Sequence, residues 1–284
     1  MKSVKAPRQA RSRGPEPAPA QNSAFAQGFR MPAEWEPHAA TWLAWPHEPT
    51  DWPGKFASVP WVFAEVIKNL TLGERVRLLV SGKRMQKEAA SALEKSQVDL
   101  KLVDFVEAAT DRSWTRDFLP LFVAKSGRAG KRALGAVKFR FNGWARYDNF
   151  ERDEAAGLKV LARATAAGVT PFQAFAEGAE RIVLEGGAID VDGEGSLLAT
   201  EECLLDGRQA RNRALGKAGV ERALRAHLGA EKVLWLGRGI AGDDTAGHID
   251  DFARFVAPGK VALAAEKNRK DANYKPLREA LERL

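Results

Sequence analysis

Cysteine is nearly absent from this sequence, since Cys203 is the only one among 284 residues. A single thiol cannot form an internal disulfide, which excludes a disulfide-stapled secreted domain. We therefore expect a protein of a reducing compartment, the cytoplasm. Histidine is also rare, with four residues. This scarcity counts against a metal centre, because ligand clusters of that kind usually contain more than one imidazole.

Long apolar runs are missing as well. No stretch approaches the roughly 20 residues that a membrane-spanning helix needs, so we expect no membrane partner. The basic start of the chain lacks the apolar core of a secretory signal. Its proline, alanine and arginine content predicts a disordered leader over residues 1–28, ahead of a folded part over residues 29–284. Hydrophobic residues make up 45% of the chain, enough for a sizeable core.

The positive charge is concentrated at one end. The formal net charge is +7. The first 30 residues hold six basic side chains against Glu16 alone, so most of the excess lies there. The remaining basic residues are spread along the chain rather than clustered. Binding to DNA or RNA needs a clustered basic face, so we expect no nucleic-acid partner.

Hydrophobic periodicity predicts short strands interleaved with single helices. No GxGxxG motif opens a helix, and the regular alternation of a doubly wound sheet is missing. The pattern therefore indicates an α/β fold of small repeated modules. The helix over residues 151–167 is expected to be capped by Asn149. Helices are predicted over residues 57–70, 83–95, 151–167, 212–228 and 274–284, and strands over residues 41–45, 75–81, 98–105, 118–125, 132–142 and 232–237, with strand-turn-strand units over residues 181–200 and 252–265.

The stretch "GDDTAGHIDD" places four carboxylates around one histidine. If the chain is extended after Gly247, His248 and Asp250 point to the same face and Asp251 points away. An imidazole beside a carboxylate suits a proton shuttle next to a bound cation. The same spacing also suits a divalent metal, with Asp243, Asp244 or Glu185 as further ligands. A solvated loop is the third interpretation.

Two more acidic positions occur beside predicted strands. "SWTRDFLP" holds Trp114 and Asp117, and Asp117 could simply pair with a neighbouring arginine. "VLEGGAID" holds Glu185, which needs a cation or a proton if it is buried, and otherwise faces water on a bulge. The two glycines after it allow a ligand to approach the backbone closely. Three carboxylates with an aromatic face suit a planar guanidinium, if these segments converge with Asp250.

The aromatic segment "FRFNGWARYDNFERDE" admits two interpretations. Trp144 or Tyr147 could line the same site. A cluster of this kind more often packs a core or an interface.

These motifs together resemble the agmatine deiminase family, the bacterial peptidylarginine-deiminase-like branch of the guanidine-modifying enzymes. The resemblance rests on "MPAEWEPHAATWLAWP", "WTRDFLP", "FNGW", "LEGGAIDVDGEGSLLATEECLL" and "GRGIAGDDTAGHIDDFARFV", in that order, from about Phe29 onward. It implies a five-bladed α/β propeller (pentein) with the active site at its central axis. It also implies hydrolysis of agmatine to N-carbamoylputrescine and ammonia, a step towards putrescine, in a cytoplasmic homodimer.

The resemblance also implies roles for individual residues. Asp117 and Asp250 would hold and polarise the guanidinium, and Trp114 would wall the pocket. Glu185 and His248 would be the carboxylate and acid/base partners. The family chemistry uses a cysteine thiolate and this histidine, so no metal or organic cofactor is implied.

One family motif has no match in this sequence. The nucleophile is expected in a C-terminal "GGGxxHC"-type motif, and the sequence ends at Leu284 without one. We therefore expect a propeller incomplete at its last blade, with the nucleophile absent and little turnover. Cys203 is expected on a strand, as a small buried side chain without an adjacent base. The alternatives are a non-catalytic guanidinium-binding remnant, a peptidyl-arginine deiminase or a metal-dependent hydrolase.

Overall fold

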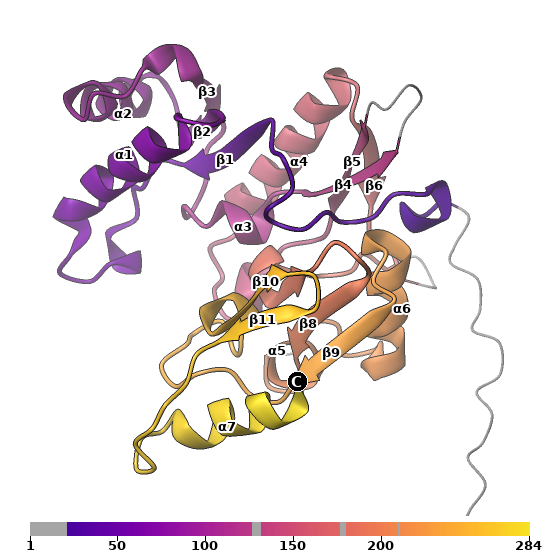
Figure 1. The fold of residues 1–284 in the computed structure, drawn as a ribbon. Coiled ribbons are helices and arrows are strands. Elements are labelled where there is room, and N and C mark those ends of the chain that lie inside the picture. Colours follow the sequence, from indigo (N-terminus) through magenta and orange to yellow (C-terminus); the bar gives the residue numbers. More distant parts are fainter. Residues whose placement is uncertain (1–21, 127–131, 177–179, 210) are drawn as a thin grey trace, which may run out of the picture.

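The computed structural model describes residues 22–126, 132–176, 180–209 and 211–284. Within these residues the strands form four small sheets, three of three strands and one of two. Most of the long helices lie toward the rim of the molecule, outside the sheets (Figure 1). The α/β class predicted from the sequence is confirmed.

The first sheet is wholly parallel. It contains β1 (Ala40–Ala44), β2 (Arg75–Val80) and β3 (Val103–Glu107) in that order. Parallel neighbours need a long crossover, and α1 (Val59–Leu70) and α2 (Lys83–Lys95) supply it. The helices bury their apolar stripes on the sheet. The core between them includes Ile67, Val76, Leu78, Val80, Ala89 and Leu93, each at most 1% exposed.

The second and third sheets share one topology. In the second, β4 (Leu121–Ser126) and β5 (Arg132–Lys138) form an antiparallel pair. The chain then crosses through α4 (Glu151–Ala166), and β6 (Thr170–Gln173) adds parallel to β5.

The third sheet repeats this order. β7 (Ile189–Val191) pairs antiparallel with β8 (Ser196–Thr200). The helices α5 (Glu201–Leu205) and α6 (Gly216–Leu228) follow, and β9 (Lys232–Leu236) adds parallel to β8. The predicted small modules are therefore a structural repeat, although the residues themselves do not repeat.

The fourth sheet begins in the same way. β10 (Ala253–Ala257) and β11 (Lys260–Leu263) form an antiparallel hairpin, and α7 (Tyr274–Arg283) follows. α7 packs against β9 and shares a core with the hairpin through Leu236, Phe255 and Leu277. None of the described helices is both long and apolar enough to cross a bilayer.

The predicted elements differ from the structure mainly at their ends. The helix over residues 83–95 is confirmed with both ends, whereas the helix predicted from residue 212 begins at Gly216. The strand predicted over residues 98–105 was wrong in its first half, where residues 100–102 form a 3-10 turn before β3. The cap predicted at Asn149 was also wrong, because Phe150 precedes α4 without a side-chain cap.

The last part of the predicted leader, residues 22–28, lies among the described residues. Residues 22–28 already contain a 3-10 turn over Phe25–Gln27, and Ala24 is fully buried. Residues 1–21, the greater part of the predicted leader, lie outside the described residues. The glycine-rich connection between β4 and β5 lies outside them as well.

A buried carboxylate on α4 organises the loop that leads toward α3 (Thr115–Phe118). Asp153 is fully buried, and its Oδ1 accepts hydrogen bonds from the backbone N–H groups of Asp111 (2.8 Å) and Arg112 (3.2 Å). Its Oδ2 is buried without a partner among the described residues. Burial raises the pKa of Asp153 to about 7, against the effect of the two backbone donors.

This raised pKa predicts a pH-dependent effect of Asp153→Asn. In the folded protein Asp153 keeps its proton up to about pH 7, whereas in the unfolded chain it releases the proton near pH 4. The free energy of unfolding of the wild type therefore falls as the pH rises from 4 toward 7. The amide of the variant keeps an acceptor oxygen for both backbone donors and cannot ionise. Urea unfolding should therefore show that the free energy of unfolding of the variant, relative to the wild type, rises by on the order of 2–4 kcal/mol from pH 4.5 to pH 8. Asp148→Asn, an exposed control, should show no such trend. A constant difference across this pH range would contradict the prediction.

Candidate active site

Three short turns lie at equivalent places in successive modules. α3 leads into β4, the 3-10 turn η7 (Gly186–Ala188) leads into β7, and the 3-10 turn η8 (Ile249–Asp251) leads into β10. η7 lies between the other two and contacts both. Each turn thus delivers its polar residues just before the first strand of its module.

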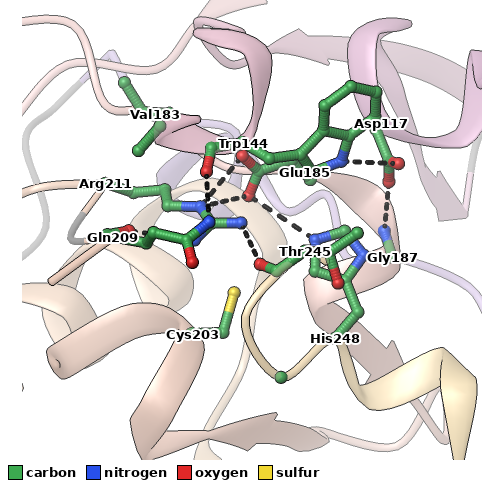
Figure 2. Close-up of polar contacts among 12 residues, drawn as sticks. Asp117, Trp144, Val183, Glu185, Gly187, Cys203, Gln209, Arg211, Thr245 and His248 are labelled. Carbon is green, nitrogen blue, oxygen red and sulfur yellow. Dashed lines mark hydrogen bonds and ion pairs between the residues drawn. The ribbon is translucent and has the colours of Figure 1, made fainter. Parts of the chain in front are cut away.

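The predicted acidic residues belong to these turns. Asp117 lies in α3, Glu185 immediately precedes η7, and His248 and Asp250 belong to the start of η8. The structure brings the four together, although they are separated by up to 133 positions in the chain. Figure 2 shows Asp117, Glu185 and His248 around Gly187.

Gly187 is the point at which three of these side chains meet. A Cβ atom added there would lie 2.6 Å from Nδ1 of His248, 2.8 Å from Oδ2 of Asp250 and 2.9 Å from Oδ1 of Asp117. The sequence suggested that this glycine admits a ligand. In the structure it admits protein side chains, which approach its backbone from two neighbouring turns.

Glu185 is fully buried and forms an ion pair with Arg211, whose side chain is also fully buried. Nε of Arg211 lies 3.1 and 3.2 Å from the two carboxylate oxygens. The same guanidinium donates to the carbonyls of Gln209 (2.9 Å) and Thr245 (2.6 Å). Arg211 therefore joins the turn before β7 to the loop before β10 (Figure 2). The interpretation in which Glu185 faces water was wrong.

Arg211 was not identified from the sequence. The sequence held only indirect evidence for it, because a buried glutamate requires a cation. The spacing of residues along the chain does not indicate which of the many arginines supplies that cation.

His248 lies between two of the carboxylates. Its side chain is 3% exposed, with Nε2 3.9 Å from Oε2 of Glu185 and Nδ1 3.7 Å from Oδ1 of Asp250. Burial alone would lower its pKa, but the attraction of Asp117, aided by Cys203 and Glu185, outweighs burial and raises the pKa of His248 to about 10. At neutral pH the ring is therefore an imidazolium, a proton donor rather than a base.

The two remaining carboxylates are shifted toward their neutral forms. Burial, together with the negative charges of Asp250 and Glu185, raises the pKa of Asp117. Burial also raises the pKa of Asp250, although His248 and Arg116 oppose the shift. Proximity of like charges is a recurrent feature of functional sites, where a bound cation relieves it.

The loop before His248 is shaped by Asp243. Its carboxylate accepts hydrogen bonds from the backbone N–H groups of Thr245 (2.7 Å), Gly247 (2.6 Å) and His248 (3.2 Å). The chain then enters η8, so the condition of an extended chain after Gly247 is not met. His248 and Asp250 reach the same place by a turn instead. Burial, followed by the charge of Asp243, raises the pKa of Asp251 to about 6.

Trp114 lies at the edge of this group. It precedes α3, is 42% exposed and donates from Nε1 to Oδ2 of Asp51 (3.1 Å). Its ring lies 5.5 Å from that of Trp52. In the described part of the chain its contacts are thus with the loop after β1, and its role as a pocket wall stays a prediction.

Cys203 lies in the first turn of α5, not on a strand as predicted. It is fully buried, as expected. An imidazole does lie near it, contrary to the prediction: Sγ, a ring nitrogen of His248 and a carboxylate oxygen of Glu185 all lie within 4.8 Å of one another. These are ligand types for zinc. However, the Arg211 guanidinium already occupies the Glu185 carboxylate, and its positive charge opposes a divalent cation there.

Comparison with known proteins connects this geometry to one family. The family model described as Porphyromonas-type peptidyl-arginine deiminase matches residues 30–284. An agmatine deiminase of Ectopseudomonas mendocina is 36% identical over 254 residues, which cover 88% of this chain and 64% of the relative. One from Pseudomonas aeruginosa is also 36% identical over the same length and shares. The chain thus spans 64% of the length of these curated relatives.

Solved structures agree. The agmatine deiminase of Enterococcus faecalis matches with a TM-score of 0.79 and 30% identity, over 92% of this chain and 67% of that one. The agmatine deiminase of C. jejuni with substrate bound matches with a TM-score of 0.75 and 27% identity, over 90% of this chain and 70% of that one.

The close approach at Gly187 predicts the effect of Gly187→Ala. The added methyl group must displace His248, Asp250 or Asp117, and such overpacking costs about 1–3 kcal/mol of the free energy of unfolding. Gly73→Ala is the matched control, because a Cβ there meets nothing within 4 Å. Urea unfolding of the two variants checks this. Equal stability of both would show that the three side chains do not meet over Gly187.

The buried ion pair predicts that Arg211→Met destabilises the protein more than a double variant does. Removing the guanidinium leaves Glu185 buried and uncompensated, at a cost of about 3–5 kcal/mol. Adding Glu185→Gln removes that charge and should recover part of the loss in the same unfolding measurement. Arg208→Met, at a guanidinium whose side chain is 75% exposed and pairs with Asp206, should cost less than about 1 kcal/mol. Additive losses in the double variant would refute the coupling.

Proposed function

Because the chain belongs to the Porphyromonas-type peptidyl-arginine deiminase family, we propose that it binds agmatine and takes part in its hydrolytic deimination. Agmatine and water give N-carbamoylputrescine and ammonia: one C–N bond of the guanidinium breaks and a C–O bond replaces it. The observation that carries the proposal is the meeting of Asp117, His248 and Asp250 over Gly187.

The charges of the site favour one cationic ligand. With its carboxylates ionised, the group of Asp117, Glu185 and Asp250 carries three negative charges. Arg211 and the imidazolium of His248 supply two positive charges. Arg116 and Arg254, which also act on Asp250, are paired with Glu34 and Asp190. One negative charge therefore remains for the ligand, and a guanidinium carries one positive charge in a plane that suits bidentate carboxylates. Arg211 already engages Glu185, so Asp117 and Asp250 are the carboxylates that hold the substrate.

His248 is the group that transfers protons in this proposal. As an imidazolium it protonates the nitrogen that leaves as ammonia, and the neutral ring then accepts a proton from the attacking water. A bound guanidinium next to His248 lowers the pKa of the ring by repulsion, which favours the first of these steps. In the family chemistry a cysteine thiolate attacks the guanidinium carbon, so turnover requires a nucleophile in addition to His248.

One observation favours a second candidate, guanidinium binding without turnover. Within the described residues the only thiol is Cys203, which is fully buried among Glu185, Arg211 and His248. The binding half of the site does not depend on it.

Calorimetric titration with agmatine tests the proposal. The wild type should bind, and Asp250→Ala should reduce affinity at least about tenfold, because a charge-assisted hydrogen bond contributes about 1.5–3 kcal/mol. Asp148→Ala, at an exposed carboxylate, is the control. A blocked peptidyl-arginine titrated in parallel separates the two substrate classes. Absence of heat at millimolar agmatine would refute the proposal.

Ammonia release measured on the same samples separates the two candidates. Turnover supports deimination, and binding without turnover supports the second candidate. If turnover occurs and Cys203→Ser leaves it unchanged, Cys203 is not the nucleophile.

Three further features are proposals of the same kind. The four sheets are blades of a five-bladed propeller, as the repeated strand order supports. Trp114, exposed beside Asp117, walls the pocket. The protein is a cytoplasmic homodimer, and sedimentation equilibrium would measure the mass of the assembly.

A further inference from the structure

We propose that Trp144 is a positioning residue for guanidinium recognition: its indole N–H, presented by a left-handed turn, holds the carboxylate of Asp117 in the orientation that grips the ligand. The inference rests on the proposed function for its ligand. The contact itself is a property of the folded chain.

The Asp117 carboxylate accepts hydrogen bonds from two donors, which belong to two different turns of the chain. Nε1 of Trp144 donates to Oδ2 at 3.1 Å, and the backbone N–H of Gly187 donates to Oδ1 at 3.0 Å (Figure 2). With one donor on each oxygen, the carboxylate cannot rotate without breaking a bond. Each oxygen keeps a second lone pair, so both can still accept from a guanidinium. The carboxylate is therefore oriented before any ligand arrives, which spares the ligand that ordering cost.

The indole also opposes the tendency of Asp117 to become neutral. Burial and the neighbouring carboxylates Asp250 and Glu185 favour the protonated acid. A hydrogen bond donated to the carboxylate favours the anion instead. Only the anion pairs with a guanidinium, so the donor contributes charge as well as direction.

The backbone around Trp144 is in an unusual conformation. Gly143, Trp144 and Ala145 have φ values of 65°, 58° and 54°, three left-handed residues in a row. A bulky aromatic residue rarely adopts this conformation, which persists only where surrounding contacts enforce it. The side chain of Asn142 accepts from the N–H of Ala145 at 2.9 Å, and the carbonyl of Gly143 accepts from the N–H of Tyr147 at 2.9 Å.

The ring is fixed by its packing as well. Trp144 is 4% exposed, and its ring meets Phe141 edge-on at 4.9 Å and Tyr147 at 5.9 Å. Its carbonyl accepts from Nε2 of Gln209 at 3.3 Å, two residues from Arg211. A tryptophan needed only for the core could use an ordinary backbone conformation. The left-handed turn is explained by the direction in which the indole N–H must point.

Trp144→Phe tests the inference, because it removes the N–H and keeps an aromatic ring. Its dissociation constant for agmatine should rise about 10- to 100-fold, the effect of a hydrogen bond to a charged group. Trp235→Phe is the matched control: that indole donates to Glu221 at 2.8 Å and is remote from Asp117 in sequence and module. The dissociation constant of Trp235→Phe for agmatine should stay within about twofold of the wild-type value, because the substitution lies away from the proposed ligand. Wild-type affinity in Trp144→Phe, with its fold intact by circular dichroism, would overturn the inference.

A second measurement needs no ligand and decides the case if Trp144→Phe fails to fold. In the proton–nitrogen NMR spectrum of the ligand-free protein, Asp117→Asn should move the indole resonance of Trp144. Single Trp→Phe variants at the other seven tryptophans assign this resonance by elimination. Asp250→Asn, a neighbouring carboxylate that does not accept from this indole, should move it less. An unmoved resonance in Asp117→Asn would overturn the inference. If the wild type binds no agmatine but this resonance moves as expected, the proposed function fails and the Trp144–Asp117 contact stands.

Discussion

Mutual repulsion among closely spaced, partly buried carboxylates is the constraint on which the rest of this structure depends. Three turns from successive modules bring Asp117, Glu185 and Asp250 toward one imidazole, and such a group is stable only if cations share the space. Arg211 neutralises Glu185 from behind, and His248 stands between the carboxylates as an imidazolium. In the proposed function, a cationic ligand balances the negative charge that remains at Asp117 and Asp250. The same electrostatics that make the site costly to fold are thus the basis of the proposed selectivity for a cation.

Local pattern predicted most of the helices and strands, although β6 and α5 were missed. Apolar periodicity located α2 with both its ends and the hairpin of β10 and β11. It located the site residues only as acidic positions beside apolar strands. Their convergence depends on contacts between modules, which no single-segment pattern contains. The motif order and its resemblance to a known family supplied that information, and the structure brings Asp117, Glu185, His248 and Asp250 together.

The features that the sequence did not reveal have tertiary causes. The 3-10 turn at Ile249–Asp251 is an exception with a local cause, since Asp243 accepts from the backbone N–H groups of Gly247 and His248 just ahead of it. Arg211 was one arginine among many until burial showed which one reaches Glu185. The left-handed backbone of Trp144 contradicts the local preference of a tryptophan. Local rules fail here at residues that contact the site, which is where such conflicts are expected.

Each of the three polar turns lies ahead of a strand rather than within it. The polar side chains of the candidate site therefore lie outside the strands that form the sheets. The backbone ladders of β4, β7 and β10 begin only after the turn has ended, so no interstrand bond depends on the identity of a reactive side chain. A change of side chain within one turn therefore leaves the strand register of its own module unchanged. Its effect is passed to the neighbouring turns instead, because the three turns pack against one another at Gly187.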